Sequence, residues 1–337
     1  RLGSLIMHEK PIRSSESFFT VPFDLILTDE VLPYDLYINS SGISSKERFV
    51  RIFPAGEALS AKDLTRFKHK YHQIYILETQ RNAYLKSLAN CDNVDDVTKT
   101  KVVKDSAIVY LDKLFDDTKE FNTELLWEAV SGCRDSVESM VDVIKDCDVQ
   151  DVQNLIGDLS YHDFYTYDHS INVSMYTISI FREIKPKAKK EEAIVAGMGG
   201  LLHDLGKMKI PTSIINNPDQ LSDEDFEEIK KHPDYGIELL EGQDFEMPGI
   251  DFEVIRRVVH EHHENYNGTG YPNKIKGEDI HLMARIVAIA DFFDALTTKR
   301  SYHEVLSIED ALEVMNRSVG KKIDPKVFKV FAKNVSK

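Results

Sequence analysis

The chain has 337 residues, enough for two ordinary domains of roughly 100–200 residues each. Its formal net charge is −15, and an acidic surface of that size repels the phosphates of DNA and RNA, so binding along nucleic acid is not expected. Hydrophobic residues make up 42% of the chain and charged residues 29%, which is the composition of a folded protein rather than a disordered one.

The sequence also argues against a membrane-spanning or secreted protein. Its longest apolar stretch runs from Ala193 to Leu202, about half of the ~20 residues that a spanning helix needs. The chain does not open with a basic leader and an apolar core, as a signal peptide would. The 3 cysteines are odd in number and lack the C-x-x-C spacing of a zinc ribbon, which fits a reducing compartment. We therefore expect a cytoplasmic protein without membrane insertion.

Short apolar or alternating runs characterise the sequence up to about residue 92. They cover residues 18–27, 34–39, 49–53 and 74–77 and are separated by Pro, Gly and Ser-Ser, which predicts four strands. Ser60 precedes the amphipathic segment AKDLTRFKHKY and is a good helix N-cap, so a helix is expected there. Residues 1–92 are thus predicted to form a small α+β domain.

Helical periodicity replaces this pattern further along the chain. Apolar residues recur every three or four positions between 95 and 146, which predicts a helical connector over residues 93–148. Helical patterns continue through residues 149–337, interrupted by irregular segments at 207–221 and 263–280. Loops of that length in a compact domain usually line a functional site. The fold class is therefore predicted to be mainly α.

The histidines are unevenly distributed. Nine of the 12 lie between His162 and His303, a window shorter than half of the chain. Histidine is the commonest metal ligand and the usual proton carrier near neutral pH. Any one of these residues can be an ordinary surface side chain, but the cluster as a whole indicates a functional site.

The strongest local signal is the segment LLHDLGK at residues 201–207. The helix before it is apolar nearly all round and should be buried, and Gly206 is expected to end it. His203 and Asp204 then lie at the inner end of that helix, where an ionised carboxylate needs a charged partner or a metal ion. Hydrogen bonds from both side chains to loops are the alternative interpretation.

A second signal is the segment HEHHENYNGTGYP at residues 260–272. Adjacent residues on a helix point about 100° apart, so His262 and His263 are not expected to chelate one ion together. They can instead serve two neighbouring ions, or one ion each. The glycines further along the segment let the backbone turn tightly and approach a ligand closely. A solvated, polar helix end is the alternative.

Three more residues complete the set of candidates. His169 opens a run with the pattern of a buried helix, and Asp291 is embedded in an apolar helical segment. A lone acid is rarely tolerated in such a place without a partner. His232 precedes Pro233 and, taken alone, is more typical of a surface residue.

The order of these motifs resembles the HD-GYP family, a branch of the HD-domain metal phosphohydrolases. The resemblance runs from about Asp158 to Phe331 and includes the His-Asp and His-His pairs, the GYP segment at 270–272 and the IDP segment at 323–325. It implies an all-helical HD-domain bundle that holds two or three ions, iron first and manganese as the alternative. The implied activity is hydrolysis of cyclic di-GMP to the linear dinucleotide and onward to GMP.

The resemblance also implies roles for individual residues. The implied metal ligands are His169, His203, Asp204, His232, His262, His263 and Asp291. Asp204 would bridge two ions, Asp294 would support the ligands, and Lys207 would act with Asp204 in catalysis by holding the scissile phosphate. The implied substrate contacts are Gly270, Tyr271, Arg300 and His303. Nitrogen and oxygen donors without thiolate also suit iron or manganese better than a structural zinc site.

The chain departs from the family pattern at a few positions. Members with three ions place a Glu one helical turn before the first histidine, where this chain has Tyr165, so two ions are expected. Asn265 and Asn267 stand where an Arg and an acid are usual, which removes an ion pair from the loop. His303 replaces a Lys or Arg.

These departures motivate an alternative function, a metal-containing but catalytically weak HD-GYP protein that binds a nucleotide or a protein partner. A third hypothesis, an HD-type hydrolase of another nucleotide, is disfavoured by the GYP segment. Segments 21–25 and 32–38 resemble, more weakly, a small domain that precedes some HD-GYP modules. That likeness implies a regulatory or partner-binding role for the first domain.

Overall fold

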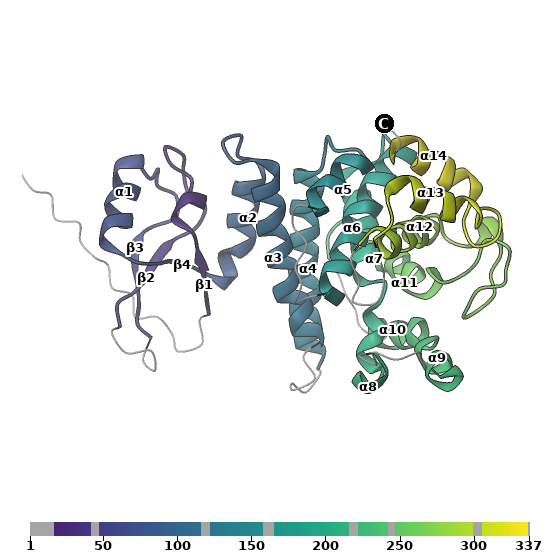
Figure 1. Ribbon diagram of the computed structural model, residues 1–337. Coiled ribbons are helices and arrows are strands. Elements are labelled where there is room, and N and C mark those ends of the chain that lie inside the picture. Colours follow the sequence, from purple (N-terminus) through teal and green to yellow (C-terminus); the bar gives the residue numbers. More distant parts are fainter. Residues whose placement is uncertain are drawn as a thin grey trace, which may run out of the picture. The chain divides into compact units, whose positions relative to one another are not determined.

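We describe a computed structural model of the chain (Figure 1). The residues it describes are 17–41, 47–115, 122–157, 165–215, 222–241, 247–298 and 305–335. The structure is mainly helical, with one small sheet near the start of the chain, so the predicted fold class is confirmed. None of the described helices is long and apolar enough to cross a membrane.

The chain divides into two compact units, Arg1–Lys99 and Thr100–Lys337. The first contains an antiparallel sheet with the strand order β1-β4-β2-β3. Its strands are β1 (Phe18–Val21), β2 (Leu36–Asn39), β3 (Phe49–Phe53) and β4 (Ile74–Leu77). The boundaries at residues 92 and 148 that the sequence suggests stay a prediction.

Local sequence explains most of the first unit. β1 is shorter than the expected run because Pro22, which lacks an N–H donor, comes directly after it, and residues Phe23–Leu25 form the 3-10 turn η1. Two helices, α1 (Ala61–Lys70) and α2 (Arg81–Ala89), accompany the sheet, with the 3-10 turn η2 (Glu78–Gln80) just before α2. The side chain of Ser60 accepts a hydrogen bond from the backbone N–H of Asp63 and caps α1, as predicted.

Helices make up the rest of the described chain. They are α3 (Asp96–Phe115), α4 (Thr123–Val143), α5 (Val149–Gly157), α6 (Tyr165–Ile184), α7 (Lys190–Leu202), α8 (Thr212–Ile215), α9 (Asp223–Ile229), α10 (His232–Leu240), α11 (Phe252–Glu261), α12 (Leu282–Thr297), α13 (Ile308–Asn316) and α14 (Pro325–Val335). The short 3-10 turn η3 (Leu205–Lys209) overlaps the start of the first irregular segment, which also contains α8, and η4 (Gly277–Asp279) lies in the second.

Helix α7 is the centre of the second unit. It packs against α4, α6, α11 and α12 (Figure 1). All of its residues from Ala193 to Leu202 are buried. Gly200 allows α6 to come close, because a Cβ at this position would lie 2.9 Å from the Cα of Ser174. A helix that is apolar all round directs the residues after its last turn into the protein interior. In this chain those residues are His203 and Asp204.

The expected reason for glycine at position 206 is wrong. α7 ends at Leu202, and Gly206 lies inside η3 rather than terminating the helix. A Cβ on Gly206 would lie 1.8 Å from the backbone oxygen of His232, so glycine is needed because η3 packs directly on the start of α10. This contact places the segment after α7 beside His232.

Candidate metal centre

The structure brings all of the sequence-predicted metal ligands together. They come from α6, the segment after α7, the first residue of α10, the segment after α11, and α12. They form two groups, and within each group the possible ligand atoms all lie within 4.8 Å of one another. The first group consists of Asp204, His232, His262 and His263, and the second group of His169, His203 and Asp291.

The two adjacent histidines belong to the same group, which differs from the sequence expectation. That expectation assumed helical geometry at both positions. α11 instead ends at Glu261, His262 is its C-cap residue, and His263 lies in the turn after it. The ring centroids of His262 and His263 are 4.1 Å apart. Both side chains therefore face one site at the end of α11.

Backbone carbonyl groups fix the tautomers of three histidines. The Nδ1 atoms of His203, His232 and His262 lie 2.7, 2.7 and 2.9 Å from the backbone oxygens three residues earlier in the chain. A carbonyl oxygen only accepts, so each Nδ1 carries a proton, and in the neutral form of each ring Nε2 presents a lone pair. The Nε2 atoms of His232 and His262 face each other at 3.2 Å. Two facing lone pairs repel each other unless a cation lies between them, so these residues fit a metal ion.

The Asp204 carboxylate lies between the two groups. Its Oδ1 atom is 3.3 Å from Nε2 of His232, and its Oδ2 atom is 3.2 Å from Nε2 of His203. Oδ1 is buried and makes no hydrogen bond to the described residues. A buried carboxylate oxygen without a donor is costly, because burial removes its hydration without replacement. A metal ion bound to Oδ1 would compensate for the missing hydrogen-bond donor.

Burial keeps the first group in its ligand form. It lowers the pKa of His232 and His262, and that of His263 to about 3, so these imidazoles are neutral. Burial alone would raise the pKa of Asp204, but His203 and Lys207 together hold it well below its usual range. Neutral histidines and an ionised carboxylate are the protonation states that bind metal.

In the second group, His169 is held by side chains. Nδ1 of His169 lies 2.7 Å from Oδ2 of Asp294, and Nε2 of the same ring lies 3.2 Å from Oδ1 of Asp291. Burial opposes protonation of His169, but the two carboxylates outweigh it and raise its pKa to about 9. Burial likewise opposes ionisation of Asp291, yet contact with His169 holds the pKa of Asp291 below its usual range.

Asp294 is fully buried and takes three hydrogen bonds. Besides its contact with His169, its Oδ1 atom accepts from Nδ2 of Asn172 at 3.0 Å and from Oγ1 of Thr298 at 2.7 Å. The sequence implied a supporting role for Asp294 but gave none to Asn172 or Thr298. The i, i+3 spacing of His169 and Asn172 on one helix was a signal for the first of these.

One side of the centre is accessible to solvent. Four residues there are half-buried: Lys207, His263, Tyr271 and Asp291. Nζ of Lys207 lies 2.5 Å from Oδ2 of Asp204, and the ring of Tyr271 stacks on that of His263 with centroids 4.8 Å apart. His203, His232 and His262 are at most 2% exposed. A ligand from solvent can therefore reach the centre at these four half-buried residues.

The loop after α11 is held by its own polar groups. Glu264, which is 4% exposed, accepts backbone hydrogen bonds from Asn273 and Ile275 and closes the loop. Gly270 is required for packing, because a Cβ there would lie 2.2 Å from the backbone nitrogen of Asn265. Sequence reasoning gave Glu264 no role, although its place directly after the His-His pair was the available signal.

The two asparagines of this loop are engaged within it. Nδ2 of Asn265 donates to Oγ1 of Thr269 at 3.1 Å, and Oδ1 of Asn267 accepts from both the backbone and the hydroxyl of Thr269. These hydrogen bonds join neutral groups within the loop. Arg300 and His303, also predicted to contact substrate, lie outside the described residues, as does the side chain of Tyr165.

Residues 159–327 match the family model described as "HD domain". The match covers half of the chain, and the chain belongs to the HD-domain family. Among solved structures, it is similar to Bd1817, a HDG"Y"P protein from Bdellovibrio bacteriovorus, with a TM-score of 0.58, 20% sequence identity and coverage of 95% of this chain and 100% of the other. Within the family, the order of the His-Asp, His-His and GYP motifs places the chain in the HD-GYP branch.

Several curated relatives each match part of the chain. Cyclic di-GMP phosphodiesterase PA4108 of Pseudomonas aeruginosa is 36% identical over 178 residues, which are 52% of this chain and 41% of that protein. Response regulator RpfG of Xanthomonas campestris pv. campestris, also named a cyclic di-GMP phosphodiesterase, is 39% identical over 41% of this chain and 35% of its own length. The 3'3'-cGAMP-specific phosphodiesterase 3 of Vibrio cholerae is 32% identical over 50% and 35%. The chain spans less than half the length of these relatives.

Proposed function

We propose that this protein is a metal-dependent phosphodiesterase that hydrolyses cyclic di-GMP to the linear dinucleotide and onward to GMP. The observation that carries the proposal is the position of Asp204. Each of its carboxylate oxygens faces a different ligand group, at 3.3 Å from His232 and 3.2 Å from His203. A carboxylate so placed suits a pair of ions that share one ligand. The names of the relatives support the substrate class.

The donor set favours two ions, iron first and manganese as the alternative. Every member of the two groups offers nitrogen or oxygen, and none is a thiolate. When bound, such ions supply Lewis acidity, which acidifies water at neutral pH and neutralises charge on a phosphate. Each group also contains both a histidine and a carboxylate, so each can hold one ion.

Lys207 is the proposed phosphate-binding residue. Its ammonium lies beside Asp204 and is 29% exposed, so it reaches both the carboxylate and the solvent side. Cations bound to Asp204 would compete for that carboxylate and leave the Lys207 ammonium to donate to a non-bridging phosphate oxygen. The Lys207 ammonium would then stabilise the charge that develops on this oxygen during hydrolysis.

Substrate contacts are proposed on the same side. Tyr271 is half-buried next to His263, and its ring offers an aromatic edge to a ligand that enters there. Gly270, Arg300 and His303 remain proposed contacts. The proposed metal ions, once bound, would attract a dianionic dinucleotide despite the formal net charge of −15.

We also propose a division of labour along the chain. Residues 1–92 would form a regulatory domain that binds a protein partner, 93–148 a helical connector, and 149–337 the HD-GYP domain. The small sheet of the first unit supports a separate function for that part, because it contributes none of the metal ligands.

Two alternatives arise from particular observations. Three relatives are named 3'3'-cGAMP-specific phosphodiesterases, which makes that hybrid dinucleotide a second candidate substrate. The side chains of Asn265 and Asn267 are engaged with Thr269 rather than offered to a ligand. This favours, as the other alternative, a metal-containing protein that binds a nucleotide or a protein partner with little turnover.

Product analysis of the full chain separates these possibilities. The protein is loaded anaerobically with Fe(II) or with Mn(II), incubated with cyclic di-GMP or 3'3'-cGAMP, and the products are separated by chromatography. The proposal expects cyclic di-GMP to be consumed faster and His203→Ala/Asp204→Ala to be inactive. Lys207→Met is expected to retain both ions and lose about a hundredfold in turnover, the effect of removing one donor to a developing charge. Nucleotide binding without turnover in all forms would contradict the proposal.

A further inference from the structure

A lysine is buried behind the second ligand group. Lys104 of α3 is 1% exposed, and its ammonium lies 3.3 Å from Oδ1 of Asp168 and 3.4 Å from Oδ1 of Asn172, both on α6. Lysine is almost never fully buried unless it is paired. Lys104 also lies outside the stretch, residues 159–327, that matches the HD domain. This chain therefore adds a buried charge to the domain from a helix that precedes it.

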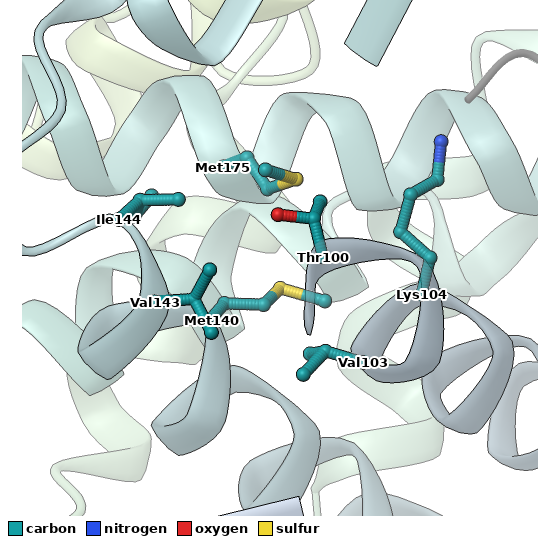
Figure 2. A pocket seen from close by; sticks show the side chains of 7 residues that line it. All are labelled: Thr100, Val103, Lys104, Met140, Val143, Ile144 and Met175. Carbon is teal, nitrogen blue, oxygen red and sulfur yellow. The ribbon is translucent and has the colours of Figure 1, made fainter. Parts of the chain in front are cut away.

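Most of the side chains around the methylene chain of Lys104 are apolar. Its side chain lines a small pocket with Val103, Met140, Val143, Ile144 and Met175, and Thr100 adds the other polar side chain (Figure 2). In the close view the methylene chain runs along this pocket and the nitrogen points away from Met140 and Val143 (Figure 2). The apolar lining cannot solvate an ammonium. The charge is therefore directed toward α6.

A chain of contacts runs from this ammonium to a metal ligand. Asn172 accepts from Lys104 with Oδ1 and donates from Nδ2 to Oδ1 of Asp294, at 3.0 Å. Oδ2 of the same aspartate lies 2.7 Å from Nδ1 of His169. An amide has an accepting end and a donating end. A cation next to the amide decides which end faces Asp294, because an ammonium attracts the carbonyl oxygen and repels the NH₂ group.

We propose that Lys104 is a positioning residue of the metal centre. It holds the Asn172 amide with its donor toward Asp294, and Asp294 in turn keeps Nδ1 of His169 protonated and Nε2 turned toward the second group. This inference rests on the proposed metal pair. Partners that orient a metal-binding histidine typically contribute 10–100-fold in metal affinity, and Lys104 acts one contact further away. Loss of Lys104 is expected to lower the Mn(II) affinity of the second group about tenfold and to leave the Mn(II) affinity of the first group unchanged.

Comparison within one background isolates this effect. Removing Lys104 alone would take away a cation that lies beside the buried Asp168 carboxylate, which threatens folding. Asp168→Asn is therefore the reference, and Lys104→Met/Asp168→Asn is the test. Mn(II) is titrated into the metal-free full chain against a competing chelator, which gives the affinities of both sites without any substrate. Lys113→Met/Glu128→Gln, an ion pair between α3 and α4 that does not touch Asn172, is the control and should match wild type.

A double-mutant cycle distinguishes positioning from general destabilisation. Asn172→Leu, also in the Asp168→Asn background, breaks the same link from its other end and should cause a similar loss at the second site. Once Asn172 is replaced, adding Lys104→Met should cost little more, because both residues act through one contact. Asn172→Leu alone still decides the matter if the Lys104 variant does not fold, since an unchanged second-site affinity would remove the proposed link.

The outcomes separate this inference from the proposed function. A wild type that binds two Mn(II) ions, with equal affinities in Asp168→Asn and Lys104→Met/Asp168→Asn, overturns the role of Lys104 alone. Effects of Lys104 and Asn172 that add up independently overturn it as well. A wild type that never binds a second ion overturns the metal pair and this inference with it. A tenfold, non-additive loss confined to the second site supports it.

Discussion

The two ligand groups are anchored in different ways. In the first group, His232 and His262 are held by backbone carbonyl oxygens one helical turn earlier, at residues 229 and 259. In the second group, His169 is held by the side chain of Asp294, which depends in turn on Asn172 and Thr298. His203 joins the second group with a backbone anchor of its own, at Gly200.

This difference has a consequence for how the two sites respond to change. A backbone carbonyl stays in place as long as the helix that carries it, whatever side chains surround it. A side-chain anchor can be removed or weakened by one substitution without disturbing a helix. The first group should therefore tolerate changes in neighbouring side chains, while the affinity of the second group should depend closely on them.

The largest effect is expected at the residue that both groups share. Asp204→Asn removes the charge between the groups, and the amide nitrogen would oppose a cation on one side. We expect loss of both ions and at least about a thousandfold lower turnover, because bound metal supplies several kcal/mol of charge stabilisation. Elemental analysis of the purified variant beside wild type measures the first effect. Retention of two ions would show that the carboxylate does not link the groups.

A substitution of Asp294 should lower the metal affinity of the second group and not that of the first. Asp294→Asn retains an acceptor for His169 but removes the negative charge that makes this imidazole a better ligand. Removing such a partner of a metal-binding histidine lowers metal affinity about 10–100-fold. We expect that loss in the second group alone, measured by chelator competition with Mn(II). Equal losses in both groups would mean that they do not differ in anchoring as the structure indicates.

The reverse test perturbs the backbone next to the first group. A Cβ at position 206 would lie 1.8 Å from the carbonyl oxygen of His232, so Gly206→Ala must displace η3 or the start of α10. Overpacking of this kind costs about 1–3 kcal/mol of folding free energy. For a unit of this size, that lowers the melting temperature by roughly 2–10 °C.

Gly206→Ala should also lower the Mn(II) affinity of the first group several-fold and leave the affinity of the second group unchanged. Calorimetry of the metal-free protein gives the melting temperature, and the Mn(II) titration gives the two affinities. Unchanged first-site affinity in a destabilised protein would show that the position of His232 does not depend on the contact with η3.

The sequence predicted the ligands better than their arrangement. His203, Asp204 and the His-His pair stand in short motifs whose residue types already indicate metal chemistry. The sharing of one group by His262 and His263 was not predicted, because adjacent residues on a helix point about 100° apart while these two lie at the end of α11. Asn172 and Thr298 were missed because amides and hydroxyls are common on helices. Only the neighbouring Asp294 gives them a role.

The secondary structure was also predicted well where it depends on a single element and poorly where it depends on contacts between elements. Period-two and period-3.6 patterns identified the strands and the long helices, because these patterns reflect burial along a single element. Gly206 was misread as a helix terminator because its requirement comes from His232, 26 positions along the chain. Features that depend on a contact between elements were therefore the ones that the sequence did not reveal.

The smallest expected effect comes from Thr298, whose hydroxyl belongs to the side-chain anchor of the second group. Thr298→Val removes one hydroxyl that donates to Oδ1 of Asp294 at 2.7 Å and keeps the shape of the side chain. A single hydrogen bond contributes about 1 kcal/mol net, which corresponds to a roughly fivefold change in an equilibrium constant. We expect this change in the Mn(II) affinity of the second group only, because the first group does not use Asp294. Thr298→Ser keeps the hydroxyl and should keep the affinity. A second group indifferent to both variants would mean that Asp294 is held firmly enough by His169 and Asn172, and that the side-chain anchor is as rigid as the backbone one.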